Sequence, residues 1–199
     1  MPLVVGLGNP GAAYANTRHN VGFLIVERLA ERLGATPPRE KFRGLLRSVE
    51  RGGRMLWLLE PQTYMNLSGE SVRRAMDFYK IPLAEVVVAH DEMDLPFGAV
   101  RVKVGGGFAG HNGLRSIGQH CGGSDFVRVR FGVDRPRGVE GTDHVLSPFD
   151  PVEQAMLPER LEHAASVLLA VIDEGPERAA NRFNQRADAG ERERRKGGR

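Results

Sequence analysis

Polar side chains that could do chemistry stand in turns beside apolar segments of this chain. Asn9 closes the first apolar run, His19 stands just before an apolar helical pattern, and Asp91 follows a second apolar run; Asn66 and Asn112 lie in glycine-containing turns. Because α/β enzymes collect such residues where strands end at one edge of a sheet, we expect these side chains to converge. One histidine, one aspartate and three asparagines, with no serine or cysteine nucleophile, indicate a base that activates water and amides that bind a polar, uncharged substrate.

His19 is the candidate base. A histidine near a helix N-terminus is held neutral and basic, and general-base catalysis contributes a rate factor of roughly 10²–10⁴. If Asp91 reaches it, the carboxylate fixes the ring tautomer and stabilises the imidazolium. The alternative is structural: His19 caps or packs, Asp91 or Asp94 caps its own turn, His90 packs, and His111 shapes its loop.

The asparagines and loop aromatics have the same two interpretations. Amides of Asn66 and Asn112 can hold a carbonyl or a developing oxyanion, worth at most about 3 kcal/mol each, or they bond their own turns. Tyr14, Tyr64 and Phe108 can stack on bases or a ribose, or simply pack.

Two glycine patterns suggest phosphate binding. Gly6, Gly8 and Gly11 fit the dinucleotide fingerprint, but Pro10 interrupts it and the next helix begins only at about Val21. The triple glycine at 105–107 lacks the Lys-Ser/Thr ending of a P-loop. A dinucleotide-dependent oxidoreductase therefore remains an alternative, as does a metallohydrolase that uses His19, His90, Asp91 and His111.

Charge is concentrated locally. The 199-residue chain carries a net charge of +3, and all of it comes from the tail at 186–199. Residues 101–137 hold seven basic and two acidic side chains. Within this stretch Arg101 alternates with Lys103, and Arg128 with Arg130, so each pair shares one face of a strand. Such pairs form either a phosphate-binding patch or a solvated sheet face.

The elements that must position these residues predict an α/β fold, with one three-layer domain over residues 1–185 and a mixed central sheet flanked by helices. We expect strands at 3–8, 44–49, 54–59, 86–89, Val100–Val104 and 126–133, and helices at Val21–Leu33, Ser68–Tyr79, 114–120, Pro151–Glu174 and 176–186. Ser68 or Ser71 is expected near the cap of the second helix. Residues 134–148 show no periodicity and are interpreted as a mobile flap; 186–199 is interpreted as a disordered charged tail.

The ordered motifs resemble the bacterial-type peptidyl-tRNA hydrolase family to about Asn184. The resemblance rests on Val4-Val5-Gly6-Leu7-Gly8-Asn9-Pro10-Gly11, Thr17-Arg18-His19-Asn20-Val21-Gly22, Pro61-Gln62-Thr63-Tyr64-Met65-Asn66-Leu67-Ser68-Gly69, His90-Asp91-Glu92-Met93-Asp94-Leu95-Pro96, Gly110-His111-Asn112-Gly113-Leu114 and Arg128-Val129-Arg130-Phe131-Gly132-Val133.

That resemblance implies hydrolysis of the ester joining an N-blocked peptide to the 3′ ribose of tRNA, which recycles tRNA after abandoned translation. It implies a cytoplasmic monomer without cofactor or metal, whose partner is the acceptor stem and 3′ end of tRNA and neither DNA nor a membrane. The roles that it implies are a general base at His19, which Asp91 keeps basic; recognition of the N-blocked substrate at Asn9; and substrate or tRNA contacts at Tyr14, Tyr64, Asn66, Asn112, Arg101, Lys103 and Arg130.

Three features depart from the family pattern. Phe108-Ala109 stands where His-Gly is expected after the triple glycine, Arg101 replaces a lysine, and the basic tail is an extension. The alternative to an enzyme of this family is a non-catalytic RNA-binding module with the basic stretch as its footprint.

The single cysteine, Cys121, and the absence of a signal-peptide pattern favour a reducing cytoplasm.

Overall fold

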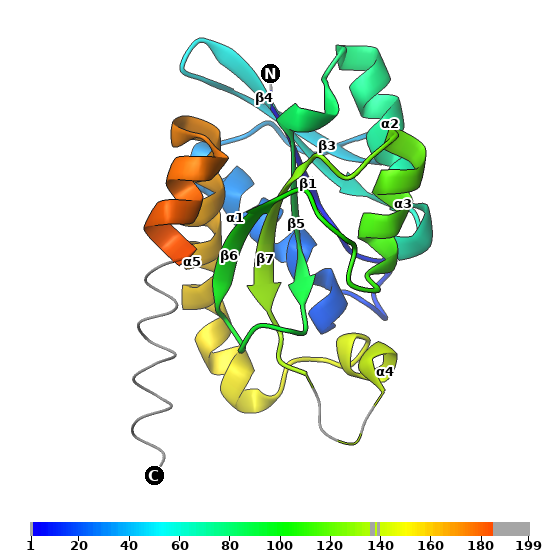
Figure 1. The fold of residues 1–199 in the computed structure, drawn as a ribbon, viewed down its shortest axis with the longest axis vertical. Coiled ribbons are helices and arrows are strands. Elements are labelled where there is room, and N and C mark those ends of the chain that lie inside the picture. Colours follow the sequence, from blue (N-terminus) through cyan, green and yellow to red (C-terminus); the bar gives the residue numbers. More distant parts are fainter. Residues whose placement is uncertain (1, 136–137, 139, 185–199) are drawn as a thin grey trace.

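The computed structural model describes residues 2–135, 138 and 140–184, and its backbone forms one sheet with helices on both faces (Figure 1). The strands are β1 (Leu3–Gly6), β2 (Arg39–Lys41), β3 (Gly44–Arg51), β4 (Arg54–Pro61), β5 (Val86–Glu92), β6 (Val100–Val104) and β7 (Val127–Gly132). The α-helices are α1 (Val21–Leu33), α2 (Ser68–Tyr79), α3 (Asn112–Cys121), α4 (Gly141–Val145) and α5 (Pro151–Glu174), and residues 176–184 are also helical. Short 3-10 turns lie at η1 (Arg18–Asn20), η2 (Met65–Leu67) and η3 (Leu83–Glu85).

The sheet is mixed, as expected, in the order β2-β3-β4-β1-β5-β7-β6. Strands β4, β1, β5 and β7 run parallel, with Val5 opposite Val88 and Asp91 opposite Phe131. The antiparallel pairs β2/β3, β3/β4 and β6/β7 complete both edges. Because the central strands are parallel, the carboxyl ends of β1, β5 and β7 lie at the same edge of the sheet, where the candidate side chains lie.

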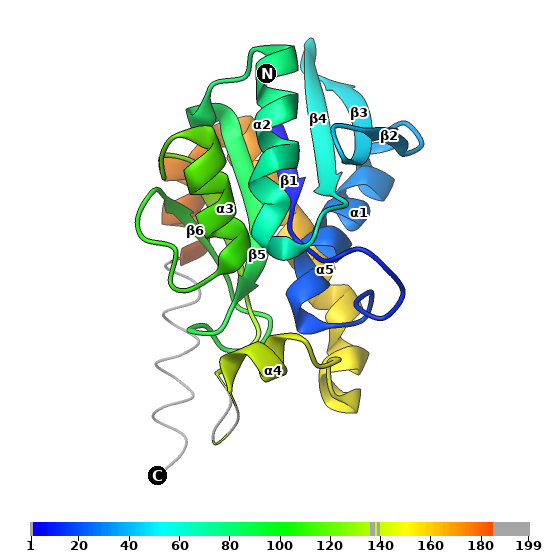
Figure 2. The same cartoon turned by 90° about the vertical axis from the view of Figure 1, so that its right-hand side faces the viewer.

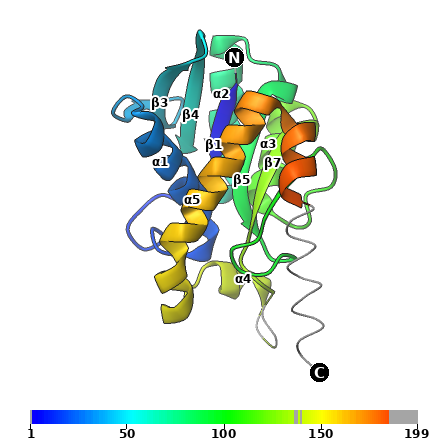
Figure 3. The ribbon, with the colours of Figure 1, turned by 90° about the vertical axis from the view of Figure 1, so that its left-hand side faces the viewer.

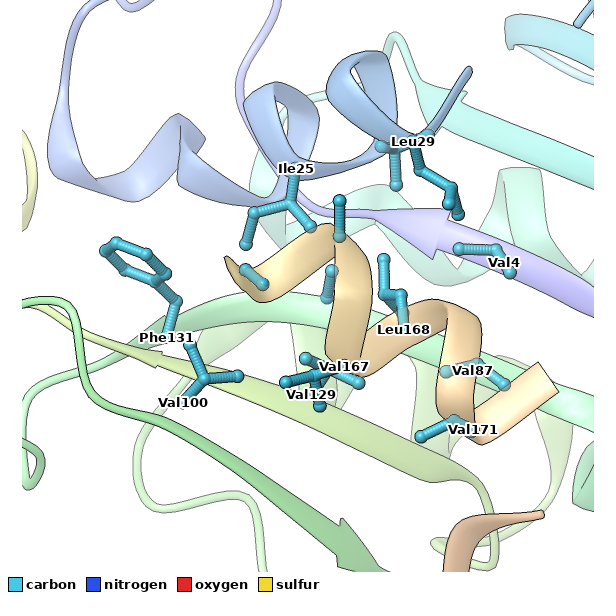
Figure 4. Packing of buried hydrophobic residues seen from close by; sticks show 14 of the residues in the cluster. Val4, Ile25, Leu29, Val87, Val100, Val129, Phe131, Val167, Leu168 and Val171 are labelled. Carbon is cyan, nitrogen blue, oxygen red and sulfur yellow. The ribbon is translucent and has the colours of Figure 1, made fainter. Parts of the chain in front are cut away.

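Each face of the sheet has its own core, because strand residues alternate between faces. Val4 and Val87 pack with α1 and α5, which cover one face (Figures 3 and 4). Leu3, Val5 and Val88 pack with α2 and α3 on the other face (Figure 2). Every residue of β5 is buried, which agrees with the continuous apolar run expected of a central strand.

The expected bounds of α1, α2 and α5 are confirmed. Gly34 closes α1 in the left-handed conformation, and Asp150 and Glu153 form a capping box that begins α5. No serine side chain caps α2: Ser68 Oγ donates to the Met65 carbonyl. The Gly69 N–H instead donates to Ser116 Oγ of α3, so a neighbouring helix replaces the expected cap.

The stretch interpreted as an aperiodic flap contains a helix, α4, which lies beyond the carboxyl ends of β5 and β7 (Figure 1). Five residues are too few to show a helical period, so the sequence pattern missed this element. Residues 136, 137 and 139 of the expected flap and the expected tail at 186–199 lie outside the described residues. Among the described helices, none is long and apolar enough to cross a membrane.

Candidate active site

The carboxyl ends of β1 and β5 and the N-terminus of α3 surround a cavity of about 270 Å³. The structure brings six of the expected residues to its wall: Asn9, His19, Tyr64, Asn66, Asp91 and Asn112. Further parts of the wall come from the residues after the triple glycine, from the end of β5 and from α4, which contributes Gly141, Thr142 and Val145. The predicted convergence of these side chains at one edge of the sheet is therefore observed.

The centre of the site is a carboxylate shared by two histidines. Nδ1 of His19 and Nε2 of His111 each lie 2.9 Å from the same Asp91 oxygen, Oδ1. The two rings are 5.0 Å apart between centroids, and the Asp91 side chain is only 3% exposed. Asp91 belongs to the end of β5, so the backbone of the central strand fixes its position.

Backbone groups determine the tautomer of His111. Its Nδ1 accepts hydrogen bonds from the N–H groups of Gly113 and Leu114, where it caps α3, so its proton sits on Nε2 and is donated to Asp91. His19 donates its Nδ1 proton to the same carboxylate. Its other ring nitrogen, Nε2, is thereby left as a lone-pair base on the cavity wall.

The electrostatics of the pair fit a base. Burial by itself would lower the pKa of His19, but the charge and hydrogen bond of Asp91 hold that pKa above the ordinary value for histidine. Burial would raise the pKa of Asp91, yet the two neighbouring imidazoles hold it well below its usual range. Asp91 is therefore ionised at neutral pH, and it stabilises the cation that forms when His19 takes a proton.

His90 has a packing role, as its structural interpretation proposed. It is 1% exposed, its Nδ1 lies 2.7 Å from the Asp91 carbonyl oxygen, and burial lowers its pKa to about 3. The ring is neutral at physiological pH and lies edge-on to His111, with centroids 5.0 Å apart.

A reciprocal amide pair holds the two loops of the site together. Asn20 accepts from the Asn9 N–H and donates from Nδ2 to the Asn9 carbonyl, both at 2.9 Å. The side chain of Asn9 in turn accepts the Met65 N–H at 2.8 Å, so its NH₂ group is the part left for the cavity. These bonds connect the loop after β1 with η1, which contains His19, and with η2.

The other polar candidates divide between the cavity and its surroundings. Asn66 in η2 and Asn112 at the start of α3 are exposed on the cavity wall, and Tyr64 beside them is 61% exposed. Tyr14 is not among the residues that line the cavity; its carbonyl accepts the hydroxyl of Thr17.

The basic candidates lie on β6 and β7, outside the cavity. Arg101 is opposite Arg130 and Lys103 is opposite Arg128, so all four share one face, as the alternation predicted. Arg128 nevertheless departs from the expected patch: it is 2% exposed and bonds to backbone carbonyls. We define the basic strip as the remaining three residues, Arg101, Lys103 and Arg130.

Glu92 connects the basic strip to the site. Its Oε2 accepts from Nε and Nη2 of Arg130, at 3.0 and 2.9 Å, and it also lines the cavity next to Asp91. Lys103 is exposed and forms no ion pair within the described part of the chain. The basic strip therefore offers at least one cation to an anionic partner beside the cavity.

The geometry counts against the two other chemistries. His19, Asp91 and His111 are close enough to hold a metal, but His111 uses its Nδ1 lone pair for α3 and directs a proton at Asp91. A Cβ at Gly6 would meet the Gly22 carbonyl oxygen at 2.4 Å, and one at Gly8 would meet the Phe23 ring at 2.7 Å. These glycines allow the close packing of α1 against the loop after β1, which accounts for them without a bound dinucleotide.

Arg18, adjacent to His19, links the segment that carries His19 to the segment that follows α4. Its guanidinium donates to Ser147 Oγ at 2.7 Å, to the Pro148 carbonyl at 2.6 Å and to Glu153 at 2.5 Å. Its backbone N–H donates to the Ser147 carbonyl. These contacts span about 130 positions of sequence, so no local pattern could reveal them.

Sequence reasoning missed His111 and Asn20 as site residues. Each was part of a quoted motif, but its partners, Asp91 and Asn9, lie in other segments. The only signal was the clustering of polar residues around the strand ends, which does not identify partners.

A histidine hydrogen-bonded to an ionised aspartate, at the strand ends of an α/β sheet, is an arrangement that can activate water for hydrolysis. The sequence model described as peptidyl-tRNA hydrolase matches residues 3–191, so the chain belongs to the peptidyl-tRNA hydrolase family. It is 53% identical to a peptidyl-tRNA hydrolase of Sorangium cellulosum over 99% of this chain and 90% of that protein. It is 47% identical to one of Syntrophotalea carbinolica, over 94% of this chain and 98% of the relative. The crystal structure of peptidyl-tRNA hydrolase from Acinetobacter baumannii matches with a TM-score of 0.85 and 41% identity, over 92% of this chain and 94% of that one.

Proposed function

We propose that this chain hydrolyses the ester between the peptide carboxyl and the 3′ ribose oxygen of peptidyl-tRNA, with His19 as general base. Family membership supports the reaction. The observation that carries the assignment of the base is the 2.9 Å contact between His19 Nδ1 and Asp91 Oδ1, which leaves Nε2 as the free base at the cavity.

The proposed step begins with a water molecule beside His19. Nε2 takes one proton of that water while its oxygen bonds to the ester carbonyl carbon, and Asp91 stabilises the imidazolium. As the tetrahedral intermediate collapses, the bond to the ribose oxygen breaks and that oxygen takes the proton back from His19. Free peptide acid and tRNA with an intact ribose hydroxyl result.

The amides of the cavity supply recognition. The NH₂ group of Asn9 is proposed to bind the blocked peptide and so to distinguish it from a free aminoacyl group. Asn66 and Asn112, both exposed on the same wall, are proposed to hold the ester carbonyl or the tRNA end. Their position on two separate elements around one cavity supports this role.

The tRNA is proposed to extend from the cavity onto the basic strip. Glu92 places Arg130 next to the site, and Arg101 and Lys103 continue the same face. Tyr64 at the rim and Tyr14 in the neighbouring loop are proposed as further tRNA contacts. We further propose that the chain acts in the cytoplasm as a monomer, with residues 1–185 as a single domain and without a cofactor.

The test compares N-acetyl-aminoacyl-tRNA with free aminoacyl-tRNA as substrates, in EDTA, for the wild type and His19→Ala. We expect release from the blocked substrate alone, and a loss of roughly 10²–10⁴ in turnover in the variant while tRNA binding is retained. A variant that loses binding in parallel would make His19 structural. Salt-sensitive tRNA binding without any release would instead favour the RNA-binding module.

A further inference from the structure

We propose that Arg128 is a positioning residue that holds the glycine loop, residues 105–110, against the sheet, and does not contact the tRNA phosphate. The proposal rests on the proposed function, because it concerns the loop that carries the cavity residues His111 and Asn112. It differs from what the alternation of basic residues predicted for this arginine.

The contacts of Arg128 are directed at the loop backbone. Nη1 donates to the Gly107 carbonyl at 2.6 Å, and Nη2 donates to the Gly106 carbonyl at 2.7 Å. A planar guanidinium can bridge two successive carbonyls in this way, and a lysine ammonium cannot reproduce the fork. No carboxylate pairs with Arg128 within the described part of the chain, so the loop carbonyls are its polar partners.

Two aromatic rings hold the guanidinium in place. Cζ of Arg128 lies 4.8 Å from the ring centroid of Phe126 and 5.5 Å from the ring centroid of Phe108. Phe126 belongs to the core and is fully buried, whereas Phe108 belongs to the loop itself. The loop is thus attached to the sheet by these two hydrogen bonds, by the Gly105 N–H, which donates to the Phe126 carbonyl at 3.1 Å, and by the Phe108 ring, which packs on the same guanidinium.

Phe108 and Ala109 shape the second half of this loop. The Phe108 ring occupies the space over Gly118 of α3, where a Cβ would meet it at 2.3 Å. Ala109 adopts a φ of +48°, a left-handed conformation that disfavours a residue with a Cβ. The strain at Ala109 is maintained because Phe108 and Arg128 hold the residues before it.

The loop contacts a residue of the basic strip at one end and a residue of the cavity at the other. At one end Lys103 lies over Gly106, where a Cβ would approach its Nζ at 3.0 Å. At the other end the His111 N–H donates to the Phe108 carbonyl at 2.9 Å, and the His111 ring donates to Asp91. Release of the loop should therefore weaken the His111–Asp91 bond and leave more of the Asp91 charge to His19.

The experiment measures amide hydrogen exchange across residues 105–111 and the pH dependence of kcat/KM. It compares the wild type with Arg128→Lys, Phe108→Leu and the control Arg32→Lys, since Arg32 lies on the surface and bonds to Glu162 and Ser166 of α5, away from the glycine loop. We expect about tenfold faster loop exchange in Arg128→Lys, a smaller increase in Phe108→Leu and no change in the control. In both loop variants the acid limb of kcat/KM should move to higher pH, because less donation to Asp91 raises the His19 pKa.

Unchanged loop exchange and an unchanged acid limb, with a higher KM and a weaker salt dependence, would overturn the proposal and make Arg128 a phosphate contact. If Arg128→Lys does not fold, Phe108→Leu decides by the same two readouts. Exchange is measured without substrate, so it tests the positioning role even if the proposed hydrolysis fails.

Discussion

At the scale of single residues, the site depends on how two histidines share one carboxylate oxygen of Asp91. Asp91 accepts from both His19 and His111, and backbone N–H groups determine which nitrogen of His111 carries the proton. The two histidines therefore have different roles although they face the same atom. We propose that His19 keeps a lone pair for the cavity, and that His111 moderates the Asp91 charge that stabilises protonated His19.

His111→Ala tests this division of roles. Loss of its donor should raise the His19 pKa and move the acid limb of kcat/KM to higher pH. Loss of its cap on α3 should also lower the free energy of unfolding by about 1 kcal/mol. His120→Ala is the matched control, because His120 lies exposed on the same helix. An acid limb at the wild-type pH in His111→Ala would show that His111 does not moderate Asp91.

At the scale of elements, the structure explains which parts the sequence could predict. The end of α1 and the start of α5 could be predicted because Gly34 and Pro151 act locally; the Asp150–Glu153 capping box, which the prediction did not use, reinforces the start of α5. Helix α4 is not visible, since its position depends on Arg18 contacts with the segment that follows it. The alternation of basic residues correctly predicted which face of β7 carries Arg128. It could not predict that the glycine loop covers Arg128 on that face, because the loop residues lie in another segment of the sequence.

Arg18→Met tests the attachment of the α4 segment. Arg18 and Glu153 are 8% and 12% exposed at their side chains, and loss of one partner of such a buried pair costs about 3 kcal/mol of unfolding free energy. Turnover should fall as well, because Arg18 precedes His19. Denaturant unfolding measures the change, and Arg32→Met should cost less than about 1 kcal/mol because its ion pair is exposed. Equal losses in the two variants would contradict the role assigned to Arg18.

At the scale of the whole molecule, the distribution of charge says more than the net charge about where an anionic partner would bind. The strip on β6 and β7 stands next to the cavity, and Glu92 joins the two regions. The sequence predicted this local concentration of charge, because residues 101–137 hold seven basic and two acidic side chains although the body of the chain without its tail is neutral. It could not predict that Arg130 would be held by Glu92, because that pair joins two strands.

Lys103→Ala tests the basic strip. We expect KM to rise with little change in kcat, and the logarithmic salt dependence of KM to weaken by about one phosphate contact. Lys80→Ala is a suitable control, because Lys80 lies at the end of α2, outside the strip. Identical salt dependences of Lys103→Ala and the wild type would remove Lys103 from the tRNA interface.

The central claim, that Asp91 makes His19 the base, is tested most directly by the pH dependence of kcat/KM in the wild type and Asp91→Asn. Since His19 must be neutral to accept a proton, activity should fall as the pH decreases through its pKa. The account predicts a wild-type limb above the ordinary histidine pKa of about 6.5. In Asp91→Asn the limb should lie at lower pH and the rate should be roughly 10²-fold lower. A limb that stays in place when the carboxylate is removed would contradict the account.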